Sequence, residues 1–485
     1  MILQFPSRLI TCLTMAALSL MLLQAPIAMA EELPKLGDAA SAVVSPEQEY
    51  KIGRAWLRQL RAQAPIIQDP MINDYLFNLV YKLASYSDIS NPRLETVVLD
   101  SSEINAFAVP GGIIGLNGGL LLSAHTEDEL AAVIAHELAH LSQRHFAREV
   151  ERSRNTSWAG LAALLASVVL AATAGGEAGM AALATTQAAS IESQLRFSRA
   201  NEEEADRIGM QTLARSGMNP EAMADFFETL QRQSRYSGNS TPEFLLTHPV
   251  TESRITDARI RAAQLPEEPN TNSLEFSLMK ARTTVLFAQD SNAIISDLQA
   301  QAKASPRFLE PVEYGLACAY LKANQLDKAL DAINRLLKLR PDRITYLATK
   351  TEILNQKGDY DDSIKLSEQA LKYSPENLAL SVNYANALTK DKRAEEAVQV
   401  LRDQLMLHDS WPMLWNMLAE AYGESHDRLG VYQAKAEYYY QSGRTMSALQ
   451  QLQYALPLAQ NQFQVESRIK ARMAEMRAST KDLKF

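Results

Sequence analysis

The segment AAVIAHELAHLSQRH, residues 131–145, constrains this chain more than any other part of it. His136 and His140 stand four residues apart, so on an α-helix both imidazoles project from one face, a turn apart. Two imidazoles placed in this way can bind one zinc ion, and Glu137 lies beside them to take a proton from the attacking water. The segment therefore predicts a helix that carries two metal ligands and a general base.

The flanking residues also favour a helix. Thr126 and Glu129 form the pattern of a capping box at its beginning. Apolar residues recur at helical spacing along it, at Leu130, Val133, Ile134 and Leu138. His145 follows His140 by five residues and rotates off the ligand face, so we expect it to be structural or to lie behind the ligands. We assign no role to the histidines without such surroundings, His125, His408 and His426.

The first thirty residues have the pattern of a secretory signal peptide. Arg8 precedes an apolar run over 9–23, Pro26 interrupts it, and the sequence Ala-Met-Ala ends at Ala30. We expect cleavage after Ala30 and a periplasmic mature chain, and we disfavour an uncleaved anchor because the apolar run is shorter than a full span. One cysteine, Cys318, then remains, so a disulfide within the chain is excluded and a small buried apolar role is expected.

Composition excludes one class of partner. Hydrophobic residues make up 47% and charged residues 22% of the chain, as in an ordinary globular protein. The net charge is −9 and no polybasic patch occurs, so we expect no binding to nucleic acid.

A small sheet is expected before the histidine motif. Residues 46–85 are expected to be helical, beginning at Ser45 and Pro46. Three short runs then have strand character, LETVVL over 94–99, NAFAV over 105–109 and GIIGL over 112–116. The segment Asn105–Pro110 is a candidate edge strand, which beside a metal would pair with an extended substrate. A purely structural hairpin is an equal alternative, because edges are often blunted.

Two uncharged runs, 155–176 and 178–191, follow the motif. The first is long enough to span a membrane. A third metal ligand beyond both runs must lie on the same side as His136, which requires an even number of crossings. The second run is too short and too polar to provide the second crossing. We expect a helical hairpin packed on the protein, with peripheral contact to a membrane surface as the alternative and true insertion as the least favoured outcome.

The C-terminal half repeats itself. After the linker-like sequence LPEEPNTNS at 265–273, Pro341 and Pro375 stand 34 residues apart. The same step relates Ala329, Ser363 and Ala397, and also Leu330, Ile364 and Val398. This period is typical of tetratricopeptide repeats, which stack into a solenoid whose groove binds other proteins. A plain helical bundle is the alternative.

The segment NEEEADRIG, residues 201–209, is the best source of a third metal ligand. Glu202 and Asp206 lie four residues apart and share a helical face, so one carboxylate could bind the metal while the other orients an imidazole. Spacing alone does not separate Glu202 from Glu203 or Glu204. A solvated acidic first turn of a helix is the alternative.

The sequence HELAH, followed by EEEAD at 202–206, by Thr-His-Pro at 247–249 and by Arg254, resembles the HtpX-like gluzincin peptidases. The resemblance covers essentially the whole mature chain when the export signal and the repeats are included. It implies that Glu202 is the third ligand of one zinc ion per chain and that Asp206 orients an imidazole.

The same resemblance places His248 and Arg254 near the active site. For His248 three roles stay open. It could donate to the oxyanion of the tetrahedral intermediate, occupy the open position of the zinc ion in a resting enzyme, or serve only as a turn residue before Pro249.

These observations together predict a mostly helical α+β chain, in which a zincin-type metallopeptidase domain precedes an α-solenoid of tetratricopeptide repeats. The expected segments are a signal peptide at 1–30, the peptidase domain at 31–265, a linker at 266–273 and the repeats at 274–485. Resemblance to periplasmic members of the family implies a zinc metalloendopeptidase and chaperone that degrades misassembled outer-membrane β-barrel proteins and assists the assembly of others. It also implies the barrel assembly machinery and the lipopolysaccharide translocon as partners.

Two other functions stay open. One is a repeat-based chaperone or scaffold with a latent metal site, and the other is a zinc amidase that acts on cell-wall peptides. Proteolysis is favoured, because a strand-like edge and protein-binding repeats both suit unfolded polypeptide.

Overall fold

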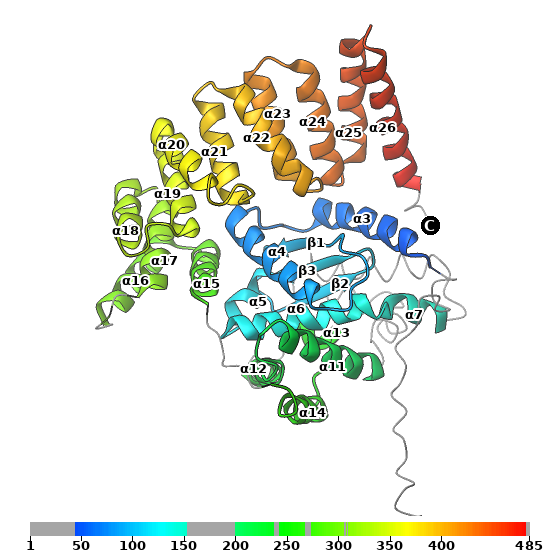
Figure 1. Ribbon diagram of the computed structural model, residues 1–485, viewed down its shortest axis with the longest axis vertical. Helices are drawn as coiled ribbons and strands as arrows, with labels where there is room; N and C mark the ends of the chain where they lie inside the picture. The colour runs from blue at the N-terminus through cyan, green and yellow to red at the C-terminus, as the bar shows by residue number, and fades with distance from the viewer. Residues whose placement is uncertain are drawn as a thin grey trace, which may run out of the picture.

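The computed structural model describes residues 44–152, 199–236, 242–266, 273–304, 307 and 309–481 (Figure 1). The expected signal peptide with its cleavage point, the uncharged runs over 155–176 and 178–191, and most of the expected linker lie outside the described residues. The described part is mostly helical with one small sheet, as expected, and a helical solenoid arches over a compact α+β unit.

The sheet has three strands, close to the three runs expected from sequence. Its strands are β1 (Glu95–Leu99), β2 (Ala106–Val109) and β3 (Ile113–Asn117). Their spatial order is β1-β3-β2, with β1 parallel and β2 antiparallel to β3. The turn between β2 and β3 needs positive φ at Gly111 and Gly112, 86° and 80°, which glycine adopts without strain. Because β3 lies between the other two strands, β2 is an edge of the described sheet.

Nine described helices build the peptidase unit around this sheet. They are α3 (Pro46–Gln63), α4 (Pro70–Ser85), α5 (Gly118–Ser123), α6 (Glu127–Ser142), α7 (His145–Arg152), α11 (Arg199–Arg215), α12 (Ala222–Tyr236), α13 (Glu243–Thr247) and α14 (Glu252–Ala262). Figure 1 shows α6 between the sheet and the layer formed by α11, α12 and α14. Residues 128–140 of α6 are all buried, so this helix is covered on every side rather than along one stripe.

The beginnings of two helices test the expected caps. At Ser45 the capping box is complete, because Ser45 accepts from the Gln48 amide and the Gln48 side chain accepts from the Ser45 amide. At α6 the Thr126 hydroxyl accepts from the Glu129 amide as expected, but the Glu129 carboxylate accepts from the amide of His125. The reciprocal bond of a capping box is thus moved one residue back along the chain.

The repeats form a continuous array of helices. They are α15 (Leu274–Phe287), α16 (Ser291–Ala304), α17 (Glu310–Lys322), α18 (Leu326–Leu339), α19 (Ile344–Lys357), α20 (Tyr360–Leu371), α21 (Leu378–Lys390), α22 (Ala394–Leu407), α23 (Pro412–Glu424), α24 (Arg428–Gln441), α25 (Thr445–Ala455), the 3₁₀ turn η1 (Leu456–Ala459) and α26 (Phe463–Lys481). The three small residues at the 34-residue step are fully buried where successive helices approach, at Ala329, Ser363 and Ala397.

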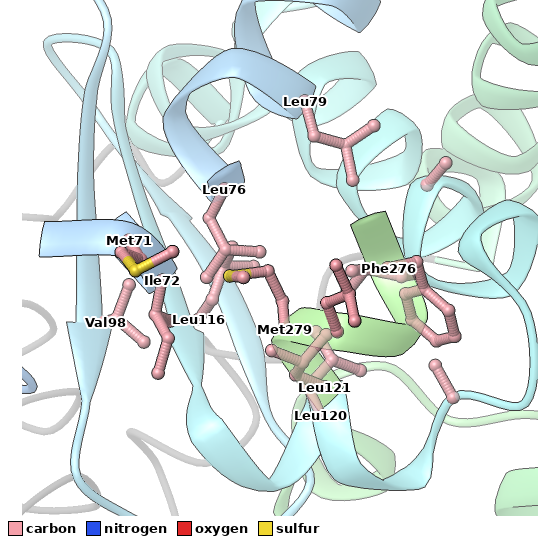
Figure 2. Packing of buried hydrophobic residues seen from close by; sticks show 14 of the residues in the cluster. Met71, Ile72, Leu76, Leu79, Val98, Leu116, Leu120, Leu121, Phe276 and Met279 are labelled. Atoms are coloured by element: carbon pink, nitrogen blue, oxygen red, sulfur yellow. The ribbon is translucent and has the colours of Figure 1, made fainter. Parts of the chain in front are cut away.

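The solenoid and the peptidase unit share one hydrophobic core. Figure 2 shows Phe276 and Met279 of α15 packed among side chains of α4, α5 and the sheet, which include Leu76, Leu116 and Leu120. All five side chains are buried. The first helix after the linker is therefore part of the peptidase core, and this fixes the direction in which the solenoid leaves it.

A buried ion cluster adds a second connection between the two parts. Arg282 of α15 donates to Asp69 at 2.7 Å and to Glu352 of α19 at 2.9 Å. Asp69 is also the N-cap of α4, so the same carboxylate caps that helix and pairs with Arg282 of α15. Cys318 is buried as expected, although its sulfur lies 3.9 Å from the Arg282 guanidinium rather than among apolar groups alone. Burial raises the pKa of the Cys318 thiol to about 11.

Replacing Arg282 by leucine should lower the free energy of unfolding by about 3 kcal/mol, the low end of the cost of breaking a buried ion pair. The low end applies because the Glu352 side chain keeps 34% of its surface exposed. Urea denaturation of the mature chain measures the change. Arg340→Leu removes an exposed arginine–glutamate pair of the same solenoid and should change the unfolding midpoint little. Equal losses from both variants would contradict the role given to Arg282.

Candidate metal centre

Two helices that cross closely bring the metal-site residues together. Helix α11 packs against α6 at Gly209, where a Cβ atom would lie 3.2 Å from both the Ala135 carbonyl carbon and the His136 nitrogen. A glycine at this point lets the two backbones approach. The acidic face of α11, with Glu202 and Asp206 one turn apart, then lies directly over the histidine face of α6.

Four donor atoms converge in this crossing. His136 Nε2 lies 3.0 Å from His140 Nε2 and 3.4 Å from His248 Nδ1. Glu202 lies 3.5 Å from each of the first two nitrogens and 3.1 Å from His248 Nδ1. Zinc–ligand bonds of about 2.0–2.1 Å place neighbouring corners of a tetrahedron about 3.3 Å apart. The observed spacing of these buried donors therefore fits a four-coordinate metal ion.

A second group of buried charges lies behind the donors. His136 Nδ1 is 3.0 Å from Asp206 Oδ1, so Asp206 faces the outer nitrogen of this imidazole. Arg254 of α14 donates to both oxygens of Asp206 at 2.8 Å, and its Nη1 lies 3.0 Å from Glu202. The Arg254 guanidinium also lies over the Phe227 ring, 4.8 Å from its centre. Arg254 thus fixes the positions of the two carboxylates that approach His136.

The electrostatics of the site favour a bound cation. Burial raises the pKa of Glu202, but the imidazoles of His248 and His136 outweigh it and hold that pKa well below its usual range. Burial likewise raises the pKa of Asp206, and contacts with His136 and Arg254 more than offset it. Burial lowers the pKa of His136, but Asp206 and Glu202 raise it to about 9. Two ionised carboxylates therefore stabilise positive charge at this point.

His140 is oriented by a separate chain of contacts. Its Nδ1 lies 2.8 Å from His145 Nδ1, and His145 Nε2 lies 3.1 Å from Glu204. Arg148 donates to the same oxygen of Glu204 at 3.1 Å, and the bond with His145 is the main cause that lowers the pKa of Glu204 to about 2. His145 therefore lies behind the ligand face, where the spacing placed it. The partners Glu204 and Arg148 were missed, although Glu204 stands in the acidic run and Arg148 three residues after His145.

Glu137 lies between the donors and the sheet edge. Its carboxylate accepts from the backbone amide of Ala108 in β2, and its Oε1 is 3.6 Å from His248 Nε2. Burial is the main cause that raises the pKa of Glu137, which would favour a carboxyl group able to exchange a proton. The edge strand thus runs beside the proposed general base, an arrangement that sequence left open.

His248 is held in place by its own short helix. Its backbone amide donates to the Phe244 carbonyl at 2.8 Å, and the Phe244 ring lies 4.8 Å from the imidazole at 30°. The Phe244 amide donates to the Ile104 carbonyl at 3.2 Å, so α13 is attached to the segment before β2. His248 Nδ1 lies with the donor atoms of His136, His140 and Glu202, so its position is compatible with a fourth metal ligand, one of the three roles considered.

The attachment of α13 is expected to depend on pH through Glu243. Burial raises the pKa of Glu243 from its ordinary value of 4.5 to about 7. A hydrogen bond with Asn105 opposes this increase, and the charge of Glu103 adds to it. The folded chain therefore holds a proton that the unfolded chain loses from pH 4.5 upward, and stability falls as the pH rises to 7. Glu243→Gln should be about 1–2 kcal/mol more stable than the unaltered chain at pH 8 and no different at pH 4. The gain is set below the full value of about 1.4 kcal/mol per pH unit because the side chain is only half-buried and solvent screens its charge.

Urea titrations at the two pH values measure this difference. Glu252→Gln changes an exposed carboxylate close by in sequence and should leave stability unchanged at both. An equal gain for Glu243→Gln at pH 4 and pH 8 would contradict the assigned protonation.

Comparison with known proteins places this geometry in a family. A family model described as peptidase family M48 matches residues 70–262, and one described as a tetratricopeptide repeat matches residues 354–421. The beta-barrel assembly-enhancing protease of Escherichia coli strain K12 is 36% identical over 454 residues, 92% of each chain. The chain belongs to the family of beta-barrel assembly-enhancing proteases. Another of these beta-barrel assembly-enhancing proteases, from Yersinia pestis, is 33% identical over 447 residues, 89% of this chain and 91% of its own.

Similarity to more distant relatives is confined to a smaller part of the chain. The mitochondrial metalloendopeptidase OMA1 of Schizosaccharomyces pombe is 30% identical over 181 residues, 37% of this chain and 50% of its own. Membership of the beta-barrel assembly-enhancing proteases makes the chain a metalloprotease with a repeat domain. Within the described residues, no helix combines the length and apolar character needed to cross a membrane.

Proposed function

We propose that the chain is a zinc metalloendopeptidase with one zinc ion per chain. The observation that carries this proposal is the convergence of His136, His140 and Glu202 around one point, with Glu137 beside them and His248 in the fourth position. When bound, zinc would supply a Lewis acid that polarises the scissile carbonyl and acidifies the attacking water. Nitrogen and carboxylate donors without cysteine suit this metal and its hydrolytic chemistry.

Each residue of the site then has its own role in hydrolysis. Glu137 accepts a proton from the attacking water and delivers it to the leaving amine. Asp206 keeps His136 oriented, and Arg254 keeps Asp206 ionised. In this arrangement His248 fills the position that water needs, so it holds the enzyme at rest and moves aside when a substrate arrives. Its Nε2, now 3.6 Å from Glu137, could then donate to the oxyanion.

The names of the relatives support a class of substrate, and the N-terminal sequence supports a location. The relatives are named for enhancing the assembly of β-barrels, so we propose that this chain degrades misassembled outer-membrane β-barrel proteins and assists others as a chaperone. A signal peptide cleaved after Ala30 would deliver it to the periplasm. The solenoid would recruit partners there, for which the barrel assembly machinery and the lipopolysaccharide translocon are the candidates. Segments 155–176 and 178–191 remain candidates for peripheral membrane contact.

The activity is tested by the choice of substrate. The mature chain is expected to cleave an unfolded outer-membrane β-barrel protein and to leave the same protein intact once it has folded in detergent, because only an extended segment can lie along β2. Gel electrophoresis follows both reactions. Purified sacculi serve as the control and should release no soluble muropeptides. Release of muropeptides with the polypeptide left intact would instead identify a zinc amidase.

A further inference from the structure

A cavity of about 680 Å³ lies between the peptidase unit and the solenoid. On one side it is lined by α3, α4 and the beginning of β1, and on the other by the α22–α23 turn, α24 and α26 (Figure 1). Arg61 joins the two sides, since its guanidinium donates to the Ser410 carbonyl at 2.7 Å. No metal-site residue lines this cavity, so the hydrolytic chemistry does not account for it.

Arg58 is a partly buried cation of this cavity, and among the described residues it has no acidic partner within ion-pair distance. Arg58 lies over the Tyr440 ring, 4.3 Å from its centre, and Arg472 lies over the same ring at 4.8 Å. Arg472 is paired with Glu437 and Glu475, each at 2.7 Å. Within the described part of the chain, no carboxylate oxygen lies within the 4.0 Å of an ion pair from Arg58. Burial is the main cause that lowers the pKa of Arg58. The charges of Arg472 and Arg61 add to this decrease, and Tyr440 and Glu475 offset only part of it. A bound anion would relieve both effects.

The surroundings add further positive charge. Arg54 and Arg61 share a single carboxylate, that of Glu95, at 3.1 and 2.9 Å. Arg93 lies 4.3 Å from the centre of the Tyr50 ring, and its exposed guanidinium has only a distant partner in Glu47, at 4.0 Å. The cavity is lined by more cations than acids, Lys51, Arg54, Arg58, Arg93 and Arg472 against Glu95, Asp409 and Glu475. The lining of the cavity is therefore positively charged, although the whole chain has a net charge of −9.

The same cavity has an apolar and aromatic wall. Phe77 of α4 packs edge-on against His408 at 5.0 Å, and His408 lies 6.4 Å from Trp411. Met406 and Leu407 at the rim are 77% and 49% exposed, so an occupant of the cavity would meet apolar surface there. An occupant of this space therefore needs an apolar side chain as well as an anionic group.

We propose that this cavity binds the C-terminal end of a polypeptide, whose free α-carboxylate pairs with Arg58 and whose last apolar or aromatic side chain packs against Phe77 and Trp411. Arginine binds carboxylates through paired donors, and the aromatic wall supplies the affinity for the neighbouring side chain. A cavity enclosed between two layers of helices admits a single chain end more readily than the surface of a bilayer. The inference rests on the proposed action on polypeptides and gives the chain a second contact with them, separate from the metal site.

Binding of one peptide in two forms tests this assignment. The mature chain with Glu137→Gln, which should not hydrolyse the probe, is titrated with a fluorescent decapeptide that ends in phenylalanine, as the free acid and as the C-terminal amide. The acid is expected to bind at least ten-fold more tightly, a difference of about 1.4 kcal/mol. Adding Arg58→Met, which keeps the apolar stem and removes the charge, should abolish the preference. Met406→Ser should weaken both forms equally.

The matched control is Arg402→Met, which removes an arginine that lies over Tyr422 at 5.6 Å outside the cavity and should keep the preference. Equal binding of acid and amide to the chain with Arg58 intact would overturn the proposal, and this comparison holds even if Arg58→Met fails to fold. A preference that survives Arg58→Met would also overturn it. Arg58-dependent binding of phosphatidylglycerol vesicles without discrimination between the peptides would assign the cavity to lipid phosphate. Cleavage of casein by the unaltered chain is scored separately, so the proposed hydrolysis stands or falls independently.

Discussion

Glu137→Gln is expected to lower kcat for casein hydrolysis by about 10²–10⁴-fold, the usual contribution of a general acid–base group, while the chain keeps its zinc. Glutamine has nearly the shape of glutamate but does not accept a proton, and Glu137 is not among the four donors. The Ala108 amide can still donate to the side-chain oxygen of the glutamine. Hydrolysis rates and zinc content measured on the same preparation separate loss of chemistry from loss of metal.

The matched control for this variant is Glu129→Gln. Glu129 is also buried in α6, but it accepts from the His125 amide at the beginning of the helix and has no place at the donor cluster. Its replacement should leave kcat unchanged. If Glu137→Gln hydrolysed casein at the rate of the unaltered chain, the general base would have to be another group.

Glu202→Gln should release the metal. The carboxylate of Glu202 faces all three imidazole nitrogens of the cluster and contributes the charge that favours a cation. Losing an outer partner of a metal ligand costs about 10–100-fold in metal affinity, so losing the ligand itself should cost more. Competition with a chromogenic chelator measures the affinity, and hydrolysis should fall with it.

Glu203→Gln is the natural comparison, because Glu203 is the next residue and is exposed. It should bind zinc as tightly as the unaltered chain. The opposite ranking, with Glu203→Gln losing zinc and Glu202→Gln keeping it, would move the third ligand to the neighbouring glutamate.

The local part of this site could be predicted from the sequence, because helical periodicity fixes it. Spacing alone placed His136 and His140 on one face and moved His145 away from it, and the structure has both arrangements. Spacing could not choose among three consecutive glutamates. The choice depends on how α11 crosses α6, which places Glu202 in the cluster and turns Glu204 toward His145.

The distant part of the site had no local signal. His248, just after the end of α13, and Arg254 of α14 both reach the cluster, and only the resemblance to a family pointed to them. The Ala108 amide is a backbone group that no motif records, and its position beside Glu137 follows from the strand order β1-β3-β2. The unpaired Arg58 arises where α3 meets α24, two elements at opposite ends of the sequence. Long-range packing determines these features, so periodicity does not reveal them.

The most direct test is zinc K-edge X-ray absorption on the mature chain with one equivalent of zinc. We expect a shell of three imidazole nitrogens and one carboxylate oxygen at about 2.0–2.2 Å. His248→Ala should reduce the imidazoles to two, those of His136 and His140. A shell of oxygen atoms alone, or one that contains a single imidazole, would contradict the metal centre described here.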